Sequence, residues 1–380
     1  MNSFAVSPAF NFIKISFYSS LILDAFCCLS NNYLGIILEK IGFLQKILRS
    51  RTFEKPGKLL AFNLKQNYSW TMKRILISIL SLLAVIIVAL PFLGDGESKR
   101  IDSEIRSKST GSFLETPDGF VHYEWEGPEN GQPVVLVQGF SNPIFIYEPL
   151  SKRLQEEGYR VLRFDLFGRG LSDRPDTTYN PDLFDRQLSN LLNSLNIQKQ
   201  IYLIGTSMGG VIVTDFILKH PERVKKLVLI APAGFPMEIP SIGRITRLPW
   251  IGEYLSKSFG DGILRKGAKK NFFKPERFPN LEKEYREQMQ FIGFKRAILS
   301  SLRNMRLESF QEEYGRLGKN PIPKLLIWGK QDRVVPFYLH EIVLKTLPGT
   351  EFLPLDEEGH VPHYESPERV APKILEFLKK

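Results

Sequence analysis

The chain has 380 residues, enough for one large domain or two smaller ones, and its 43% hydrophobic and 24% charged residues are ordinary for a globular protein. Its net charge of +10 suits either nucleic acid or an anionic membrane surface. The sequence has no zinc-finger spacing, Walker loop or aromatic–basic RNA motif, so we expect no nucleic-acid partner. The two cysteines, Cys27 and Cys28, are adjacent, which excludes a disulfide framework and a cysteine-based metal site in the rest of the chain.

An apolar segment near the N-terminus is long enough to cross a membrane. Residues 75–93 contain no charged side chain, and as a helix they would extend about 28 Å, close to the thickness of a bilayer core. Met72, Lys73 and Arg74 come directly before this segment, as at the start of a signal peptide, but no small-x-small cleavage site follows it. We therefore predict an uncleaved signal anchor over residues 72–93, with secretion after signal cleavage as the alternative.

Positive charge lies on the N-terminal side of this anchor. Residues 1–71 contain eight Lys or Arg against three acids. The positive-inside tendency then places the N-terminus in the cytoplasm and residues 94–380 on the extracytoplasmic side. A second span over the partly apolar residues 17–38 would remove the basis for this orientation. Residues 1–71 have no clear periodic pattern, and a signal-like start occurs at Met72. We therefore hypothesise that translation starts at Met72 and that residues 1–71 are an extension that is not native.

Strand and helix patterns begin after a polar segment, residues 94–111, which we interpret as a linker. Two β-type runs around Pro117, Asp118 and Gly119 predict a hairpin. Apolar runs then alternate with helix-patterned segments, which predicts βαβ units and a mostly parallel sheet. The further strands are predicted at 133–139, 160–165, 201–205, 226–232, 324–329 and 351–356, and the helices at 147–157, 181–195, 211–219, 338–346 and 367–379.

One stretch interrupts this alternation. Residues 235–320 contain few strand signals and several helical ones, such as 281–292 and 295–307. An insertion above the carboxyl edge of a sheet usually forms a lid over a site, so we interpret it as a helical cap. The cap contains 17 Lys or Arg and 10 Asp or Glu, a net charge of +7. The core domain then consists of residues 112–234 and 321–380.

A G-x-S-x-G motif, Gly205 to Gly209, lies between the apolar run 201–204 and a helix-patterned segment. A sharp strand–turn–helix connection lifts the central serine, Ser207, to the end of the sheet, and the glycines provide room beside the strained turn. The motif alone is short enough to occur by chance, so its context and its downstream partners carry the prediction.

Taken together, the motifs resemble the α/β-hydrolase superfamily over about 270 residues, in the order that this family uses. The resemblance implies an α/β-hydrolase fold: a mostly parallel eight-stranded sheet flanked by helices, with a helical cap inserted after the sixth strand. The matching segments are VLVQGFSNP (135–143), DLFGRGLSDRP (165–175), GTSMGG (205–210), LLIWGKQDRVVP (325–336) and GHVPHYESPERV (359–370).

The resemblance also implies a Ser–Asp–His triad. Ser207 is the expected nucleophile, His360 the base that accepts its proton, and Asp332 the acid that orients the imidazole. His363 competes with His360, but the family places its histidine directly after a glycine such as Gly359. Asp356 competes with Asp332, although it lies only four residues before His360.

Two backbone N–H groups are expected to form the oxyanion hole, those of Met208 and Phe140. Here the sequence departs from the family, because the usual His-Gly pair is Gln138-Gly139. Since a glutamine side chain can still form hydrogen bonds, we expect the hole to survive. The turn that begins at Asp165 is expected to hold a loop near the triad and to take no part in the chemistry.

The expected function is a membrane-anchored serine hydrolase that acts on carboxylic esters, including lipid esters such as monoacylglycerols. Ser207 argues against the dehalogenases and epoxide hydrolases, which need an aspartate nucleophile, and the lipase-type HGGG segment is absent. A C–C bond hydrolase, an amidase, a perhydrolase and an inactive hydrolase fold used for binding remain as alternatives. No cofactor and no metal ion is implied, and the sequence does not indicate an oligomeric state.

Overall fold

The computed structural model describes residues 57–380, of which residues 57–69 are described by their backbone alone. Our expectations for the two cysteines, for residues 17–38 and for most of residues 1–71 therefore fall outside the described residues. The chain divides into two compact units, Met1–Leu82 and Leu83–Lys380. All contacts discussed below lie within the second unit.

A long helix, α2 (Gly57–Gly94), contains the predicted apolar segment and begins upstream of Met72. Its stretch Trp70–Gly94 has 25 residues and reaches a mean hydropathy of 3.0, and none of its most apolar window is buried. By length and composition this stretch is able to cross a membrane, although a signal sequence would meet the same criteria.

The second unit contains one eight-stranded sheet with the order β1-β2-β4-β3-β5-β6-β7-β8. The β1–β2 and β2–β4 pairs are antiparallel, and all other neighbours are parallel. The mostly parallel sheet predicted from the sequence is thereby confirmed. The strands are β1 (Ser112–Thr116), β2 (Gly119–Glu126), β3 (Pro133–Val137), β4 (Arg160–Phe164), β5 (Ile201–Thr206), β6 (Val224–Ile230), β7 (Lys324–Gly329) and β8 (Glu351–Leu355).

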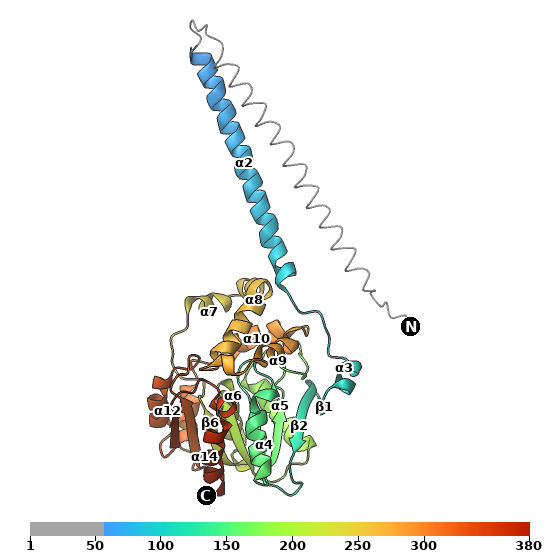
Figure 1. Cartoon of the computed structure of the whole chain (residues 1–380), viewed down its shortest axis with the longest axis vertical. Coiled ribbons are helices and arrows are strands. Elements are labelled where there is room, and N and C mark those ends of the chain that lie inside the picture. Colours follow the sequence, from blue (N-terminus) through green and yellow to red (C-terminus); the bar gives the residue numbers. More distant parts are fainter. Residues whose placement is uncertain (1–56) are drawn as a thin grey trace. The chain divides into compact units, whose positions relative to one another are not determined.

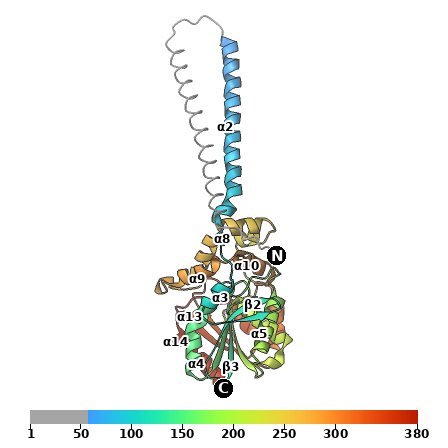
Figure 2. The same ribbon diagram turned by 90° about the vertical axis from the view of Figure 1, so that its right-hand side faces the viewer.

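Helices cover both faces of this sheet. Helix α4 packs against α14 and α13 on one face, whereas α6 packs against α5 on the other. Figure 2 shows α4 and α5 on opposite sides of the strands. The flanking helices are α4 (Glu148–Glu156), α5 (Pro181–Ser194), α6 (Met208–Lys219), α12 (His340–Thr346), α13 (Pro362–Glu365) and α14 (Pro367–Lys379).

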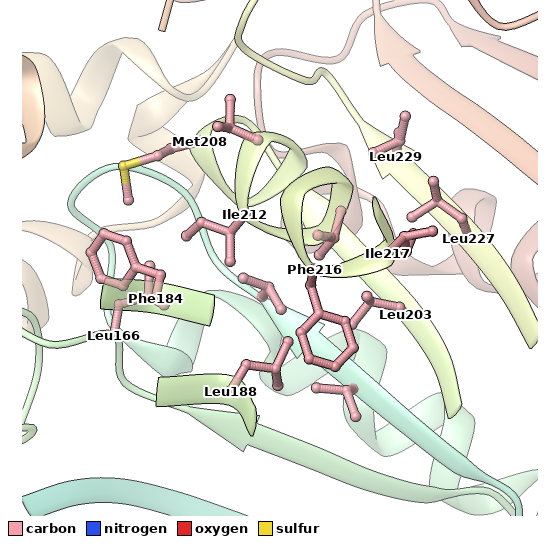
Figure 3. Close-up of a cluster of buried hydrophobic side chains, with 14 of the residues drawn as sticks. Leu166, Phe184, Leu188, Leu203, Met208, Ile212, Phe216, Ile217, Leu227 and Leu229 are labelled. Atoms are coloured by element: carbon pink, nitrogen blue, oxygen red, sulfur yellow. The ribbon is translucent and has the colours of Figure 1, made fainter. Parts of the chain in front are cut away.

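The central strands are buried on both faces, which explains their continuous apolar runs. Val135 and Val137 of β3 belong to one hydrophobic cluster, and Val134 and Leu136 between them belong to another, because successive side chains of a strand point to opposite faces. Figure 3 shows part of the first cluster, where side chains of α6 and α5 gather over β5 and β6. The site described below is therefore attached to strands that cannot move independently.

A group of helices, α7 to α11, is inserted between β6 and β7, as the sequence predicts. We call these elements the helical insertion. In Figure 1, α7 to α10 gather at one end of the sheet. The inserted helices are α7 (Ser241–Thr246), α8 (Ile251–Lys270), α9 (Leu281–Met289), α10 (Phe294–Asn304) and α11 (Gln311–Gly318).

Two helices lie where the sequence gave no clear helical pattern. Helix α8 has 20 residues but buries only small ones, so it lacks the apolar periodicity by which a helix is recognised. Helix α3 (Ser103–Lys108) lies in the segment interpreted as a linker, and the side chain of Asp102 caps it by accepting a hydrogen bond from Ile105 N at 2.9 Å.

Candidate active site

Ser207 connects β5 to α6 in a backbone conformation that is rare for a residue with a side chain, with φ at 56°. The turn is held through both the N–H and the carbonyl of Ser207 by the end of β6, because Ser207 N donates to Ile230 O at 2.9 Å and Ala233 N donates to Ser207 O at 3.0 Å. A Cβ atom at Gly209 would lie 2.2 Å from Val137 O. The glycine is therefore required by the close approach of α6 to β3.

His360 and Asp332 form a buried pair beside this turn. The Nδ1 atom of His360 lies 2.7 Å from Asp332 Oδ2. The other oxygen of Asp332 accepts hydrogen bonds from Val334 N at 2.7 Å and Val335 N at 2.9 Å. Because backbone groups fix one oxygen of Asp332, the other oxygen is directed at the imidazole. The bond between this oxygen and Nδ1 leaves Nε2 as the free ring nitrogen of His360.

A single cavity of about 280 Å³ brings the serine and the histidine together. Ser207 and His360 both line it, with Gly139 and Phe140 from the loop after β3. The described residues show no hydrogen bond between the Ser207 hydroxyl and His360. Catalytic hydrogen bonds are often long in a site without substrate, so the shared cavity is the more informative observation.

His363 and Asp356, the alternatives to His360 and Asp332 in the sequence, lie in different surroundings from those two residues. His363 is fully buried and packs against Tyr147 with the two rings tilted and their centroids 4.6 Å apart, and burial lowers its pKa to about 3. Neither of its ring nitrogens has a hydrogen-bond partner among the described residues. Asp356 is exposed and pairs with Lys330 at 2.7 Å, which lowers the pKa of its carboxyl. Neither residue lines the cavity.

Asp165 ties together several loops at this end of the sheet. It accepts hydrogen bonds from Ile144 N and Leu171 N, each at 2.9 Å, and pairs with His122 Nδ1 at 2.7 Å. Its carboxylate is 1% exposed and does not line the cavity. These contacts agree with a holding role for the turn that begins at Asp165.

Arg169 belongs to the turn that begins at Asp165, which we expected to hold a loop near the triad, and the sequence does not indicate which groups it bonds. Its guanidinium donates to Phe140 O at 2.8 Å, to Phe167 O at 3.0 Å and to Ser301 Oγ of α10 at 2.9 Å. Burial lowers its pKa to about 10. In contrast, the amide of Gln138 is fully buried but has no hydrogen-bond partner among the described residues, so the bond that we expected from this glutamine is not observed.

The helical insertion also reaches the histidine loop. His360 N donates to Asn271 O at 2.7 Å, directly after α8. Glu365 accepts from Phe273 N and from Gly359 N, each at 2.7 Å. Burial raises the pKa of the Glu365 carboxyl to about 7, and the two N–H donors oppose this shift. The sequence carries no signal for the contacts of Asn271 with His360 and of Phe273 with Glu365, because these partners are about 90 residues apart.

The comparison with known protein families agrees with this architecture. A family model described as the alpha/beta hydrolase fold matches residues 132–367, a range that contains the whole site. The chain belongs to the α/β-hydrolase family. Its match includes every strand from β3 to β8 and the helical insertion between them.

Individual relatives are hydrolases with several kinds of substrate. Lipase 1 of Psychrobacter immobilis is 27% identical over 289 residues, which are 74% of this chain and 86% of that protein. A 2-hydroxy-6-oxononadienedioate/2-hydroxy-6-oxononatrienedioate hydrolase of Burkholderia vietnamiensis is 28% identical over 68% of this chain and 91% of its own length. The structure of an esterase from Exiguobacterium antarcticum is 25% identical, covers 71% of this chain and 100% of its own, and superposes with a TM-score of 0.61. The chain is thus a hydrolase with lipase-like and esterase-like neighbours.

Proposed function

We propose that this hydrolase is a membrane-anchored serine esterase that forms an acyl-enzyme on Ser207. The single observation that carries the proposal is the arrangement of Asp332 and His360 beside the cavity that also exposes Ser207. A serine hydroxyl is a poor nucleophile unless a base removes its proton, and the free Nε2 atom of His360 is a base on the same cavity.

In the proposed reaction, His360 accepts a proton and then gives it up again, once in each of two steps. Ser207 Oγ attacks the ester carbonyl while His360 Nε2 accepts its proton, and the Asp332 carboxylate stabilises the imidazolium. The imidazolium then protonates the departing alcohol. A water molecule attacks the acyl-enzyme with the same histidine as base, which releases the acid and restores Ser207.

We propose that two N–H groups, those of Met208 and Phe140, bind the oxyanion of the tetrahedral intermediate. Met208 is the first residue of α6, so its N–H has no acceptor within the helix and lies at the positive end of the helix dipole. Phe140 lines the cavity, and its own carbonyl is fixed by Arg169. Donors that are fixed before the reaction stabilise the intermediate without reorganisation.

The lining of the cavity favours an apolar acyl chain. Apolar side chains surround the serine, and the volume of about 280 Å³ suits one chain rather than several. The apolar lining residues are Phe140, Ile146, Ile263, Leu264, Val334 and Val361. A monoacylglycerol or another ester with a single chain fits this description.

The apolar helix supports attachment to a membrane. We propose that residues 72–93 of α2 form an uncleaved anchor, with the N-terminus in the cytoplasm and the hydrolase unit on the extracytoplasmic side. Cleavage of the same segment as a signal peptide is the alternative. Sequencing the N-terminus of the mature protein distinguishes the two forms.

A fluorophosphonate probe, which reacts with activated serines, tests the mechanism on the full-length protein. We expect the wild type to be labelled and Ser207→Ala to lose both the labelling and esterase activity, by a factor on the order of 10⁴ or more in kcat. Ser141 lies on the same cavity, so Ser141→Ala is the matched control and should still be labelled. A folded wild type that the probe does not label would instead support a binding protein with an inactive hydrolase fold.

A substrate panel tests the reaction class. The relative from Burkholderia vietnamiensis keeps a C–C bond hydrolase as the second candidate, because it is as similar to this chain as the lipase is. We expect p-nitrophenyl esters of medium chain length to be hydrolysed faster than amides or vinylogous diketones. Faster turnover of the diketones would assign the chain to C–C bond hydrolysis on the same triad.

A further inference from the structure

One surface of the helical insertion is apolar and is left uncovered by the described part of the chain. We call it the α7–α8 face. Its members are exposed large hydrophobic residues on α7, on α8 and on the turn between them: Ile242, Ile245, Leu248, Trp250, Ile251 and Phe259. Single exposed hydrophobic residues are normal on soluble proteins, but a contiguous group of this size marks a binding surface.

Helix α8 is inverted relative to an ordinary surface helix. Its buried residues are Gly252, Ser258, Gly260 and Ala268. The large apolar side chains of α8 that are exposed recur every four residues or in multiples of four, which places them along one side of the helix. The exposed side of α8 therefore has no apolar partner among the residues that the structure describes, whereas Leu264 on another side packs against a buried cluster.

Trp250 adds a second feature. It is 87% exposed and precedes α8 with φ at 67°, in the left-handed region that disfavours residues with a side chain. Exposure of the indole to water and the backbone strain are both unfavourable. An apolar medium around the indole would remove the first of these penalties, and tryptophan is the residue type that favours the membrane–water interface.

The α7–α8 face is fixed to the end of α2. Tyr254 of α8 donates its hydroxyl to Ile87 O at 2.8 Å, and the backbone of Gly94 packs so closely on Ser258 that a Cβ atom there would lie 2.2 Å from its carbonyl oxygen. The last turns of α2 within this unit are themselves apolar and exposed, with Phe92 at 82%. The two apolar surfaces are therefore continuous.

The segment after α2 strengthens this attachment with buried polar contacts. Lys295 is 3% exposed and pairs with Asp95 at 2.9 Å and with Asp261 of α8 at 2.8 Å. Glu97 accepts hydrogen bonds from Gly293 N and Lys295 N at the start of α10. These contacts hold the insertion beside the point where α2 ends.

The α7–α8 face also leads to the catalytic cavity. Ile263 follows Phe259 by one helical turn, is 54% exposed and lines the cavity that contains Ser207. Leu264, beside it, lines the cavity as well. An apolar path therefore runs from the exposed face of α8 to the reacting serine.

We propose that the α7–α8 face lies in the surface of a phospholipid bilayer and admits lipid esters to Ser207 along Ile263, directly from the membrane. This inference rests on the proposed anchor and esterase function. Exposed basic residues accompany the face, Arg244 and Lys266, and their long side chains can reach lipid phosphates while their stems stay in the apolar layer. The occupant is a bilayer rather than a second copy of the chain, because α2 ends at this face.

Kinetics with two presentations of substrate test the proposal on the full-length protein in phospholipid nanodiscs. The test variant is the double substitution Trp250→Glu with Ile251→Glu. The control is Tyr338→Glu, which changes a residue 58% exposed on the sheet domain, in the short helix Phe337–Leu339. We expect the double variant to hydrolyse a monoacylglycerol in the nanodisc at least tenfold more slowly, and water-soluble p-nitrophenyl acetate within twofold of the wild-type rate.

The outcomes separate this proposal from the one on which it rests. Equal rates of both substrates in wild type and double variant would overturn the docking of the face, and so would an equal loss on both substrates. Wild type without activity on either ester would instead refute the esterase function. The control should behave as wild type on both.

A spectroscopic measurement tests the docking without activity. Lipids with brominated acyl chains quench tryptophans that enter the bilayer, and the difference between wild type and Trp250→Phe isolates the emission of Trp250. We expect this emission to be quenched and shifted to shorter wavelength in nanodiscs. Emission that is not quenched would overturn the proposal, and so would a dimer of the full-length protein that the double variant abolishes.

Discussion

The catalytic cavity has two walls that differ in what holds their residues in place. The sheet wall consists of the loops after β3, β5, β7 and β8, and the α8 wall consists of one side of α8. On the sheet wall, both oxygens of Asp332 have fixed partners, and the Ser207 turn is bonded to neighbouring strands. On the α8 wall, Ile263 and Leu264 present only apolar surface to the cavity.

The difference follows from what each wall has to do. Proton transfer and oxyanion binding require atoms placed to within a few tenths of an ångström, and directional hydrogen bonds provide this precision. Admission of an acyl chain requires apolar area but no particular geometry, because the hydrophobic effect is not directional. Changes on the sheet wall should therefore alter kcat, and changes on the α8 wall should alter access.

The largest effect on the sheet wall after loss of the nucleophile is expected for Asp332→Asn. The asparagine oxygen can still accept from Val334 N and Val335 N, so the fold should be retained. Its NH₂ group would face His360 Nδ1, which then has to accept, and the imidazole proton would move to Nε2, the nitrogen that must act as base. We expect kcat to fall by a factor on the order of 10⁴ with little change in thermal stability.

Asp356→Asn provides the matched control for this substitution. Asp356 is the other acid close to the histidine in the sequence, but it is exposed and pairs with Lys330. Its replacement should leave kcat within about twofold of wild type. A larger loss in Asp356→Asn than in Asp332→Asn, measured on the same ester, would show that the orienting acid has been misassigned.

The sheet wall could be predicted from the sequence to a large extent. Strands buried on both faces leave continuous apolar runs, such as those of β3, β5 and β7, and the turns at their ends then fall in one place. Ser207 and Asp332 each follow such a run within a few residues, whereas His360 follows the partly exposed edge strand β8. Local sequence patterns were therefore enough to predict that these three residues follow the ends of strands.

The α8 wall could not be predicted in the same way. Pattern recognition assumes that a helix buries its large apolar residues, whereas α8 buries glycine, serine and alanine. The contacts of Arg169 with Ser301, and of Glu365 with Phe273, were equally hidden, because they join residues distant in the sequence. Such contacts depend on how the insertion folds back over the sheet, and no local pattern records that.

Arg169→Lys tests whether the two walls act separately. The guanidinium bonds Phe140 and Phe167 on the sheet side and Ser301 on α10, and a lysine ammonium cannot reproduce this planar set of donors. We expect unfolding of the full-length protein in detergent to require about 2 kcal/mol less free energy. Because Phe140 would lose its support, kcat should fall by about tenfold, a loss of about 1.4 kcal/mol in transition-state stabilisation.

Ser301→Ala removes only the bond that crosses from Arg169 to the insertion. We expect this control to lose about 1 kcal/mol of stability and to keep kcat within about twofold. If the two variants lost kcat equally, the insertion would be needed to position the oxyanion hole. That result would contradict the view that the two walls act independently.

The last expected effect is on stability rather than on kcat, and it concerns the contact that joins the two walls at Glu365. Burial raises the pKa of this carboxyl to about 7, well above its value in an unfolded chain. Between about pH 4.5 and 7 the folded protein holds a proton that the unfolded chain has released, so this group's contribution to stability is complete at acidic pH and is lost as the pH rises. Glutamine at this position cannot titrate. The free energy of unfolding of wild type, minus that of Glu365→Gln, should therefore fall by roughly 2–3 kcal/mol from pH 5 to pH 8.

Urea unfolding of both proteins across this pH range provides the measurement. A difference that stays constant with pH would show that Glu365 has an ordinary pKa and that Phe273 and Gly359 bind a carboxylate already charged at pH 5. A difference that falls as expected would show that the cost of burying the charged Glu365 carboxylate exceeds the stabilisation that Phe273 N and Gly359 N give it. The fall would not loosen the α8 wall, because both N–H donors bind a carboxylate more strongly than a neutral carboxyl group.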